Sequence, residues 1–187
     1  MSHQIVIVEY ALLAASMLGA MAFDLGARRI PNRLVLAGTG LAFALHAVAV
    51  ITGSPALAGG RWWAPLAGFG TGLAVLMPLY LLRATGAGDV KLMAMIGAFI
   101  GAPATLGAAL CTLVAGGLLS LVFMFGRGVA AQTLDNVRFL LTDWTLRTGG
   151  GRRAGLAPLQ TTAARLPYAV AIAVGTAASL LWPPAGF

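Results

Sequence analysis

Carboxylates are rare in this chain, so each can be weighed individually as a candidate for chemistry. The 187 residues contain five acidic side chains, which are Glu9, Asp24, Asp89, Asp135 and Asp143. Asp135 and Asp143 stand among arginines in a polar segment, a pattern typical of solvated surface charge. Glu9 lies near the start of an apolar run, and we expect it to snorkel towards water at the end of that run. Asp24 and Asp89 are therefore the two candidates.

Asp24 and Asp89 each stand at the end of an apolar run and in an unusual local sequence. Residues 24–32 read DLGARRIPN, and residues 86–92 read GAGDVKL. An ionisable group at membrane depth is costly and indicates a functional site. Gly86 and Gly88 lack a Cβ atom, which lets the backbone turn tightly and lets a substrate strand approach the carboxylate.

Two carboxylates brought together in a site of low dielectric share a proton, because both cannot ionise cheaply. One then acts as a base that activates water, and the other acts as an acid towards the oxygen of a peptide carbonyl. This chemistry is peptide hydrolysis of the aspartyl type, and it needs neither a metal nor an organic cofactor. Asp24 and Asp89 are 65 residues apart, so only a shared depth in the fold can bring them together.

Each motif alone has an ordinary explanation. An Asp at a helix end can be a solvated charge paired with Arg28 or Arg29, and Gly-x-Gly is common in membrane helices. The two motifs together, at matching depth, favour the catalytic interpretation.

The elements that must position these residues are apolar helices. Hydrophobic residues make up 59% of the chain and charged residues 9%, with a mean hydropathy of +0.90. This composition excludes a soluble domain and a disordered chain. The net charge of +7 reflects the cytosolic bias of Lys and Arg, and we expect no nucleic-acid partner. Six apolar runs cover residues 5–23, 34–51, 65–82, 90–101, 104–125 and 166–182.

The basic residues predict how these runs cross the membrane. With six crossings and the N-terminus outside, every Lys and Arg except Arg61 falls on the inner side. The sequence therefore predicts an all-α integral membrane protein of six transmembrane helices, with residues 1–187 forming one polytopic domain. To span, the fourth helix must begin near Ala84, about a turn and a half before Asp89.

A cytosolic loop at about 126–165 separates the fifth and sixth helices in this arrangement. Four of its apolar residues share one helical face: Leu134, Val137, Leu141 and Trp144. They predict an amphipathic helix, which lies either on the inner membrane surface or against the helix bundle.

No metal site or disulfide is indicated. Cys111 is the only cysteine, and the two histidines, His3 and His46, are far apart in the sequence. We expect no cofactor.

The sequence resembles the type IV prepilin peptidases, which are GxGD aspartyl proteases of the bacterial inner membrane. Asp24 with Ile30-Pro31-Asn32 resembles the first motif of that family, and residues 86–92 match GxGDxKL at every specified position. The run Leu166-Pro167-Tyr168-Ala169 resembles the sequence that opens the family's last helix.

The resemblance implies that Asp24 and Asp89 are catalytic and act at the cytosolic face of the inner membrane. It implies a prepilin or pseudopilin substrate, whose basic leader is removed. Gly86, Gly88, Pro31 and Asn32 would shape the site. Lys91 could orient a phospholipid phosphate, tune the two carboxylates, or simply snorkel to the interface. Membrane lipids are therefore also expected partners.

The departures indicate a subtype. Larger prepilin peptidases carry a cytosolic domain with paired CxxC motifs that is linked to N-methylation. This sequence lacks those cysteines, so methylation is not implied. It resembles the compact CpaA/TadV-like branch, which serves tight-adherence (Flp) pili.

Three alternatives to this resemblance stay open. A relative of presenilin or signal peptide peptidase should carry a Tyr-Asp pair, whereas Phe23 precedes Asp24 here. A proton-coupled transporter would place its carboxylates near the midplane, often in two similar halves. A non-catalytic membrane subunit of a secretion system would not need both aspartates.

Overall fold

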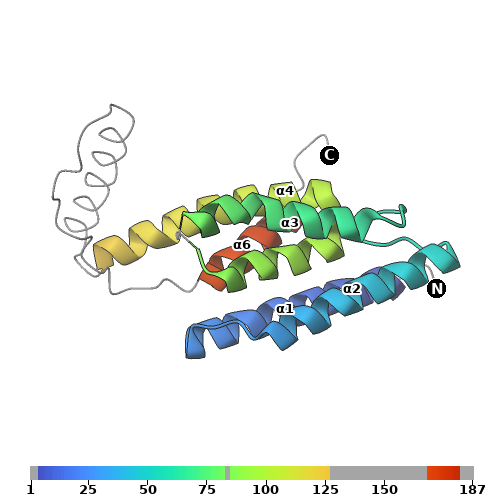
Figure 1. Cartoon of the computed structure of the whole chain (residues 1–187), viewed down its shortest axis with the longest axis horizontal. Coiled ribbons are helices and arrows are strands. Elements are labelled where there is room, and N and C mark those ends of the chain that lie inside the picture. The colour runs from blue at the N-terminus through green and yellow to red at the C-terminus, as the bar shows by residue number, and fades with distance from the viewer. Residues whose placement is uncertain (1–3, 83–84, 127–167, 182–187) are drawn as a thin grey trace. The chain divides into compact units, whose positions relative to one another are not determined.

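The computed structural model describes residues 4–82, 85–126 and 168–181, and all secondary structure in these ranges is helical (Figure 1). The elements are α1 (Gln4–Ala27), α2 (Asn32–Thr52), α3 (Ala64–Leu81), α4 (Ala87–Gly126) and α6 (Tyr168–Leu181). Two compact units are formed, Met1–Gly116 with Pro167–Phe187, and Gly117–Leu166. The first unit contains every candidate site residue, and the second includes the end of α4.

Helices α1 and α2 lie side by side and run in opposite directions (Figure 1). Arg28 ends α1 with a positive φ of 51°, and its backbone N–H bonds to the Asp24 carbonyl at 2.9 Å. Pro31 then has extended backbone (φ −64°, ψ 130°) and forms the N-cap of α2. Its fixed φ suits this position, and its carbonyl accepts the N–H groups of Leu34 and Val35. The short connection therefore places the end of α1 beside the start of α2.

Helix α4 consists of two helical segments separated at Gly101. Gly101 has φ 76° and ψ 169°, a conformation that side chains disfavour. The chain folds back at this point (Figure 1), in keeping with the separation of the apolar runs 90–101 and 104–125 in the sequence. From Asp89 to Gly101 every residue except Lys91 is buried, which explains why this run is apolar on all sides.

The start of α4 differs from our prediction. The helix begins at Ala87, not near Ala84, so Asp89 lies in its first turn. The reason is local, because the backbone at Gly86 and the Asp89 side chain together form the cap that starts the helix.

Close helix packing in the first unit depends on glycine. A Cβ atom built on Gly68 of α3 would lie 1.9 Å from the carbonyl oxygen of Gly97, and one on Gly72 would lie 2.4 Å from that of Met93. The backbones of α3 and α4 therefore approach as closely as small residues allow, as is common in membrane helix pairs.

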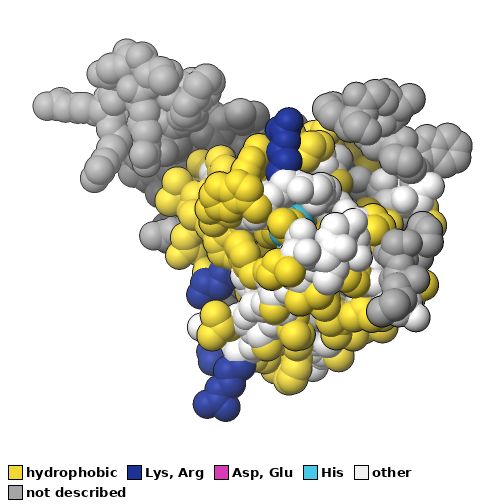
Figure 2. Space-filling view, turned by 90° about the vertical axis from the view of Figure 1, so that its right-hand side faces the viewer, with side chains coloured by type: hydrophobic (Ala, Val, Ile, Leu, Met, Phe, Trp, Pro, Cys, Tyr) yellow, Lys and Arg dark blue, Asp and Glu magenta, His cyan; other side chains and the backbone are white. Residues whose placement is uncertain are grey.

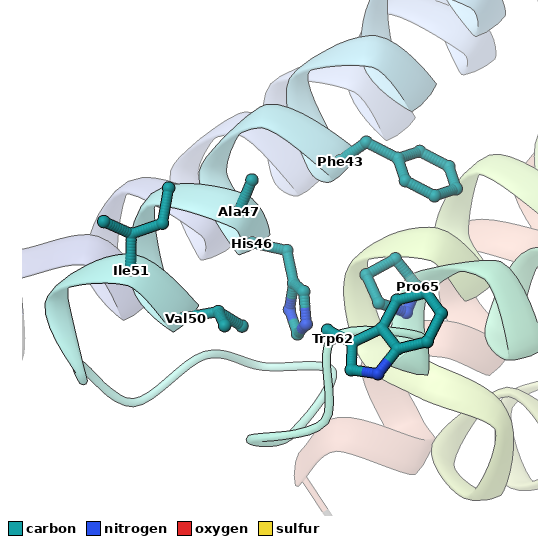
Figure 3. Close-up of a pocket in the computed structure, with 7 residues that line it drawn as sticks. All are labelled: Phe43, His46, Ala47, Val50, Ile51, Trp62 and Pro65. Carbon is teal, nitrogen blue, oxygen red and sulfur yellow. The ribbon is translucent and has the colours of Figure 1, made fainter.

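The end of the unit opposite Asp24 is held together by two buried polar side chains. Glu9 is 1% exposed, and its carboxylate accepts the Leu57 N–H at 2.8 Å. The prediction that Glu9 snorkels is therefore wrong, because the partly buried Leu57 N–H of the α2–α3 loop, and not water, meets its carboxylate. His46 Nε2 lies 2.9 Å from the Arg61 carbonyl. Figure 3 shows His46 beside Trp62 and Pro65, in a pocket of about 290 Å³.

Four helices, α1 to α4, are long and apolar enough to cross a membrane. Large hydrophobic side chains are widely exposed on them, and the surface in Figure 2 is dominated by hydrophobic side chains. Such a surface is expected where lipid, not water, is the solvent. The expected helix within 126–165, with Asp135 and Asp143, lies almost entirely outside the described residues.

Candidate active site

The carboxylate of Asp24 links the end of α1 to the start of α6. Asp24 is 9% exposed, and its Oδ2 accepts the backbone N–H of Ala169 at 3.0 Å. Ala169 is the second residue of α6, where backbone N–H groups have no partner within the helix. The positive end of the α6 dipole therefore stabilises negative charge on Asp24. The partner is a backbone N–H and not a guanidinium of Arg28 or Arg29.

Asp89 has a similar environment at the start of α4. It is 8% exposed, and its Oδ2 accepts the N–H of Gly86 at 2.9 Å. In return, the Asp89 N–H donates to the Gly86 carbonyl at 3.1 Å. An acidic side chain at the third helical position that reaches back to the residue before the helix is one half of a capping box.

The two carboxylates are close enough for the charge of Asp24 to act on Asp89. Each lies beside the N-terminal end of a different helix, and each is more than nine-tenths buried. The fold thus brings together two acidic groups that are 65 residues apart in the sequence. Two carboxylates held close together in a site of low dielectric can share a proton, and paired acid and base chemistry requires such sharing.

Tyr168 is a third member of this cluster, and our sequence analysis gave it no role. It is half-buried and close enough to Asp89 for an electrostatic interaction. Its ring packs against Gly116, where a built Cβ atom would lie 2.7 Å from the ring. The signal was present, because Tyr168 belongs to the motif at 166–169 and opens α6.

Gly86 lies against the Asp89 carboxylate, and Gly88 lies against the Ile30 side chain. A Cβ atom on Gly86 would lie 3.3 Å from Oδ2 of Asp89, and one on Gly88 would lie 3.4 Å from the Ile30 side chain. Gly86 thus gives the Asp89 carboxylate room to cap the helix. Gly88 lets the α1–α2 connection approach α4.

Lys91 and Asn32 are also brought together, across 59 residues of sequence. The Lys91 Nζ donates to Oδ1 of Asn32 at 3.1 Å, and both side chains are exposed. Pro31 precedes Asn32 as the N-cap of α2. The predicted site residues therefore fall into two groups, one around the buried carboxylates and one at the exposed start of α2.

In the described ranges, no three His, Cys, Asp or Glu side chains gather where they could hold a metal ion. Among the residues that the structure describes, the polar groups shown to interact with Asp24 and Asp89 include the backbone N–H groups of Ala169 and Gly86 and the side chain of Tyr168.

Comparison with known families identifies the chain. A model of the type IV leader peptidase family matches residues 11–121, more than half of the sequence. The chain belongs to the type IV leader peptidase family. Both Asp24 and Asp89 lie within the matched segment, whereas Tyr168 lies beyond it. No curated protein and no solved structure matches the chain.

Membership of the leader peptidase family indicates a protease that acts on type IV leader sequences. The apolar helices agree with a multi-pass membrane protein.

Proposed function

We propose that this leader peptidase is a membrane-embedded aspartyl endopeptidase that removes the basic leader from type IV or Flp prepilins. The proposal rests on two buried carboxylates, Asp24 and Asp89, which lie at the ends of three helices and near enough for the charge of one to act on the other. A carboxylate that served only as a helix cap would not need a second carboxylate nearby.

In the proposed reaction, the ionised member of the pair takes a proton from water while the water oxygen bonds to the peptide carbonyl carbon. The protonated member gives its proton to the carbonyl oxygen, forming a tetrahedral intermediate. The carbon–nitrogen bond then breaks, and its electron pair stays on nitrogen, which takes a proton from the protonated carboxyl of the pair. As the carbonyl bond re-forms, one hydroxyl of the intermediate returns a proton to the other carboxylate, so that the pair again holds one proton. The products are the carboxyl end of the leader and the free amine of the mature pilin.

The proposed topology has six spans, with the N-terminus outside and the two aspartates at the cytosolic face of the bacterial inner membrane. The break at Gly101 lets α4 supply two of the six spans. Arg28, Arg29 and Arg33 follow Asp24 closely in the sequence, whereas Arg61 lies in the α2–α3 loop, where its backbone carbonyl is 2.9 Å from Nε2 of His46. This distribution supports an inner location for the site.

Within this proposal residues 1–187 act as one peptidase, and the 126–165 loop is cytosolic. The substrate is a prepilin or pseudopilin of the tight-adherence (Flp) type, as the compact CpaA/TadV-like sequence suggests. The substrate's apolar helix would lie in the membrane, with its leader at the inner face.

The test is cleavage of a Flp-type prepilin co-expressed with the chain, followed by the size shift of the substrate. We expect the wild type to cut and both Asp24→Asn and Asp89→Asn to lose at least about a hundredfold in rate. Both variants should accumulate normally, because an Asn oxygen can still accept the backbone N–H that each Asp accepts.

Glu9→Gln is the matched control, since Glu9 is a buried carboxylate far from the pair in the fold. It should cut like the wild type. Full activity in either Asp variant would exclude that residue as catalytic. A wild type that cuts none of several prepilins would favour a transporter or a non-catalytic secretion subunit.

A further inference from the structure

A second feature, distinct from the buried carboxylates, is a groove between α2, α3 and the start of α4. Its volume is about 400 Å³, within the range of sites that bind small molecules. The lining residues are Asn32, Arg33, Val35, Leu36, Thr39, Phe69 and Lys91.

One end of the groove is cationic. Arg33 and Lys91 both line it, and its lining contains no carboxylate. The Lys91 ammonium donates one hydrogen to Asn32 at 3.1 Å, which holds its position and leaves two donors for a ligand. Arg33 is the second residue of α2, so its guanidinium lies near the positive end of a helix dipole. This end is suited to a single anionic group such as a phosphate.

The rest of the groove is apolar and runs along α2. Leu36 is 75% exposed, and Val35 and Phe69 complete the wall. The Thr39 hydroxyl already donates to the Val35 carbonyl at 2.8 Å, so its polar group is satisfied. From Asn32 to Thr39 the helix rises by about 10 Å. A small water-soluble anion would occupy only the cationic end and would leave the apolar wall uncovered.

We propose that this groove binds one anionic phospholipid, with its phosphate between Arg33 and Lys91 and an acyl chain along Val35, Thr39 and Phe69. The cationic end of the groove complements the phosphate of a lipid, and the apolar wall complements its acyl chain. Anionic lipids are favoured because each Lys or Arg near a membrane surface attracts them. The proposal does not depend on the proteolytic activity.

The groove lies between the starts of α2 and α4, which are distant from each other in the sequence. The ligand would contact the first turn of α2 through Arg33 and the first turns of α4 through Lys91, which lies two residues after Asp89. Bound lipid would therefore hold these two helix starts together and raise the thermal stability of the protein.

The experiment is native mass spectrometry of the purified full-length chain in detergent, with palmitoyl-oleoyl phosphatidylglycerol or phosphatidylcholine added. We expect the wild type to retain the anionic lipid about tenfold better than the zwitterionic one. Arg33→Gln with Lys91→Gln should abolish that preference. Arg28→Gln with Arg29→Gln is the matched control, because it removes the same charge from exposed positions that do not line the groove.

Equal retention of both lipids by the wild type would overturn the proposal. Equal loss of preference in the two double variants would also overturn it, because the attraction would then be general electrostatics. Thr39→Trp, which fills the apolar part, provides an independent test that leaves both cations in place. It should reduce retention of the anionic lipid severalfold, and unchanged retention would exclude the acyl-chain position. Displacement of the lipid by millimolar inorganic phosphate would show that the site recognises a free anion instead.

Discussion

Asp24 and Asp89 each combine two tasks that mutations can separate. Each carboxylate accepts a backbone N–H at the start of a helix, α6 for Asp24 and α4 for Asp89. That contact stabilises the fold by about 1 kcal/mol, as helix caps generally do. The proposed chemistry requires in addition that one carboxylate can ionise while the other holds a proton. Asn retains the first property and loses the second, which is why it is more informative than Ala at both positions.

Tyr168 offers a prediction at the same scale. Tyr168 is close enough to Asp89 for an electrostatic interaction, and its ring packs on Gly116. We expect Tyr168→Phe to lower kcat for prepilin cleavage by about two- to tenfold, since one polar neighbour of the pair is lost. KM and the thermal melting temperature should not change, because the ring stays in place.

The measurement is steady-state cleavage of a prepilin by purified enzyme in detergent. Tyr80→Phe is the control, because Tyr80 is an exposed tyrosine on α3 and should behave like the wild type. An unchanged kcat in Tyr168→Phe would show that the hydroxyl does not act on the pair.

At the scale of elements, the site depends on how closely helices pack behind it. Helix α4 carries Asp89, and its buried segment is set by backbone contact with α3 at Gly68 and Gly97. These positions tolerate no side chain, because the neighbouring atom is a backbone carbonyl that cannot rotate away.

We therefore expect Gly68→Ala to destabilise the protein by about 1–3 kcal/mol through overpacking. Gly70→Ala is the matched control, since a Cβ atom there meets nothing within 4 Å and Ala favours a helix over Gly. Thermal unfolding in detergent is the measurement. If Gly68→Ala melts no lower than Gly70→Ala, the close approach of α3 and α4 is wrong.

The opposite end of the unit has its own connecting contact. Glu9 of α1 accepts the Leu57 N–H of the α2–α3 loop at 2.8 Å, and Ala58 of that loop packs against Gly101. We expect Glu9→Ala to cost about 1–3 kcal/mol, because the Leu57 N–H loses its partner. Glu9→Gln keeps an acceptor and should be milder.

Thermal unfolding again measures the difference between the two Glu9 variants. Cleavage per folded molecule should be unchanged in both, since Glu9 is not part of the carboxylate pair. A loss of cleavage in Glu9→Ala without loss of stability would instead assign Glu9 a role in the reaction.

At the scale of the whole molecule, the proposed reaction requires the pair to face the cytosol. Gly26 near Asp24 and Gly60 in the α2–α3 loop are both exposed, with open space at the Cβ position. In a Cys111→Ser background, we expect Gly60→Cys to react with a membrane-impermeant maleimide added to spheroplasts. Gly26→Cys should react only after the membrane is permeabilised. The reverse pattern would invert the topology and place the aspartates outside.

The sequence by itself determined the class of protein, the break at Gly101 and the two aspartates as candidates. These follow from local properties, since hydropathy, turn residues and a seven-residue motif are legible within one short segment. The family match over residues 11–121 agrees with that interpretation.

Only the tertiary structure decided which side chains meet. Ala169 bonds to Asp24 across 145 residues, Lys91 to Asn32 across 59 and Leu57 to Glu9 across 48. The burial of Glu9, the groove beside Lys91 and the position of Tyr168 likewise depend on contacts between segments that are distant in the sequence. No local pattern encodes them, because the energy of each contact depends on a partner that chain folding brings from elsewhere. For the same reason, the energy of a polar group at a helix end is settled only when its neighbour is known.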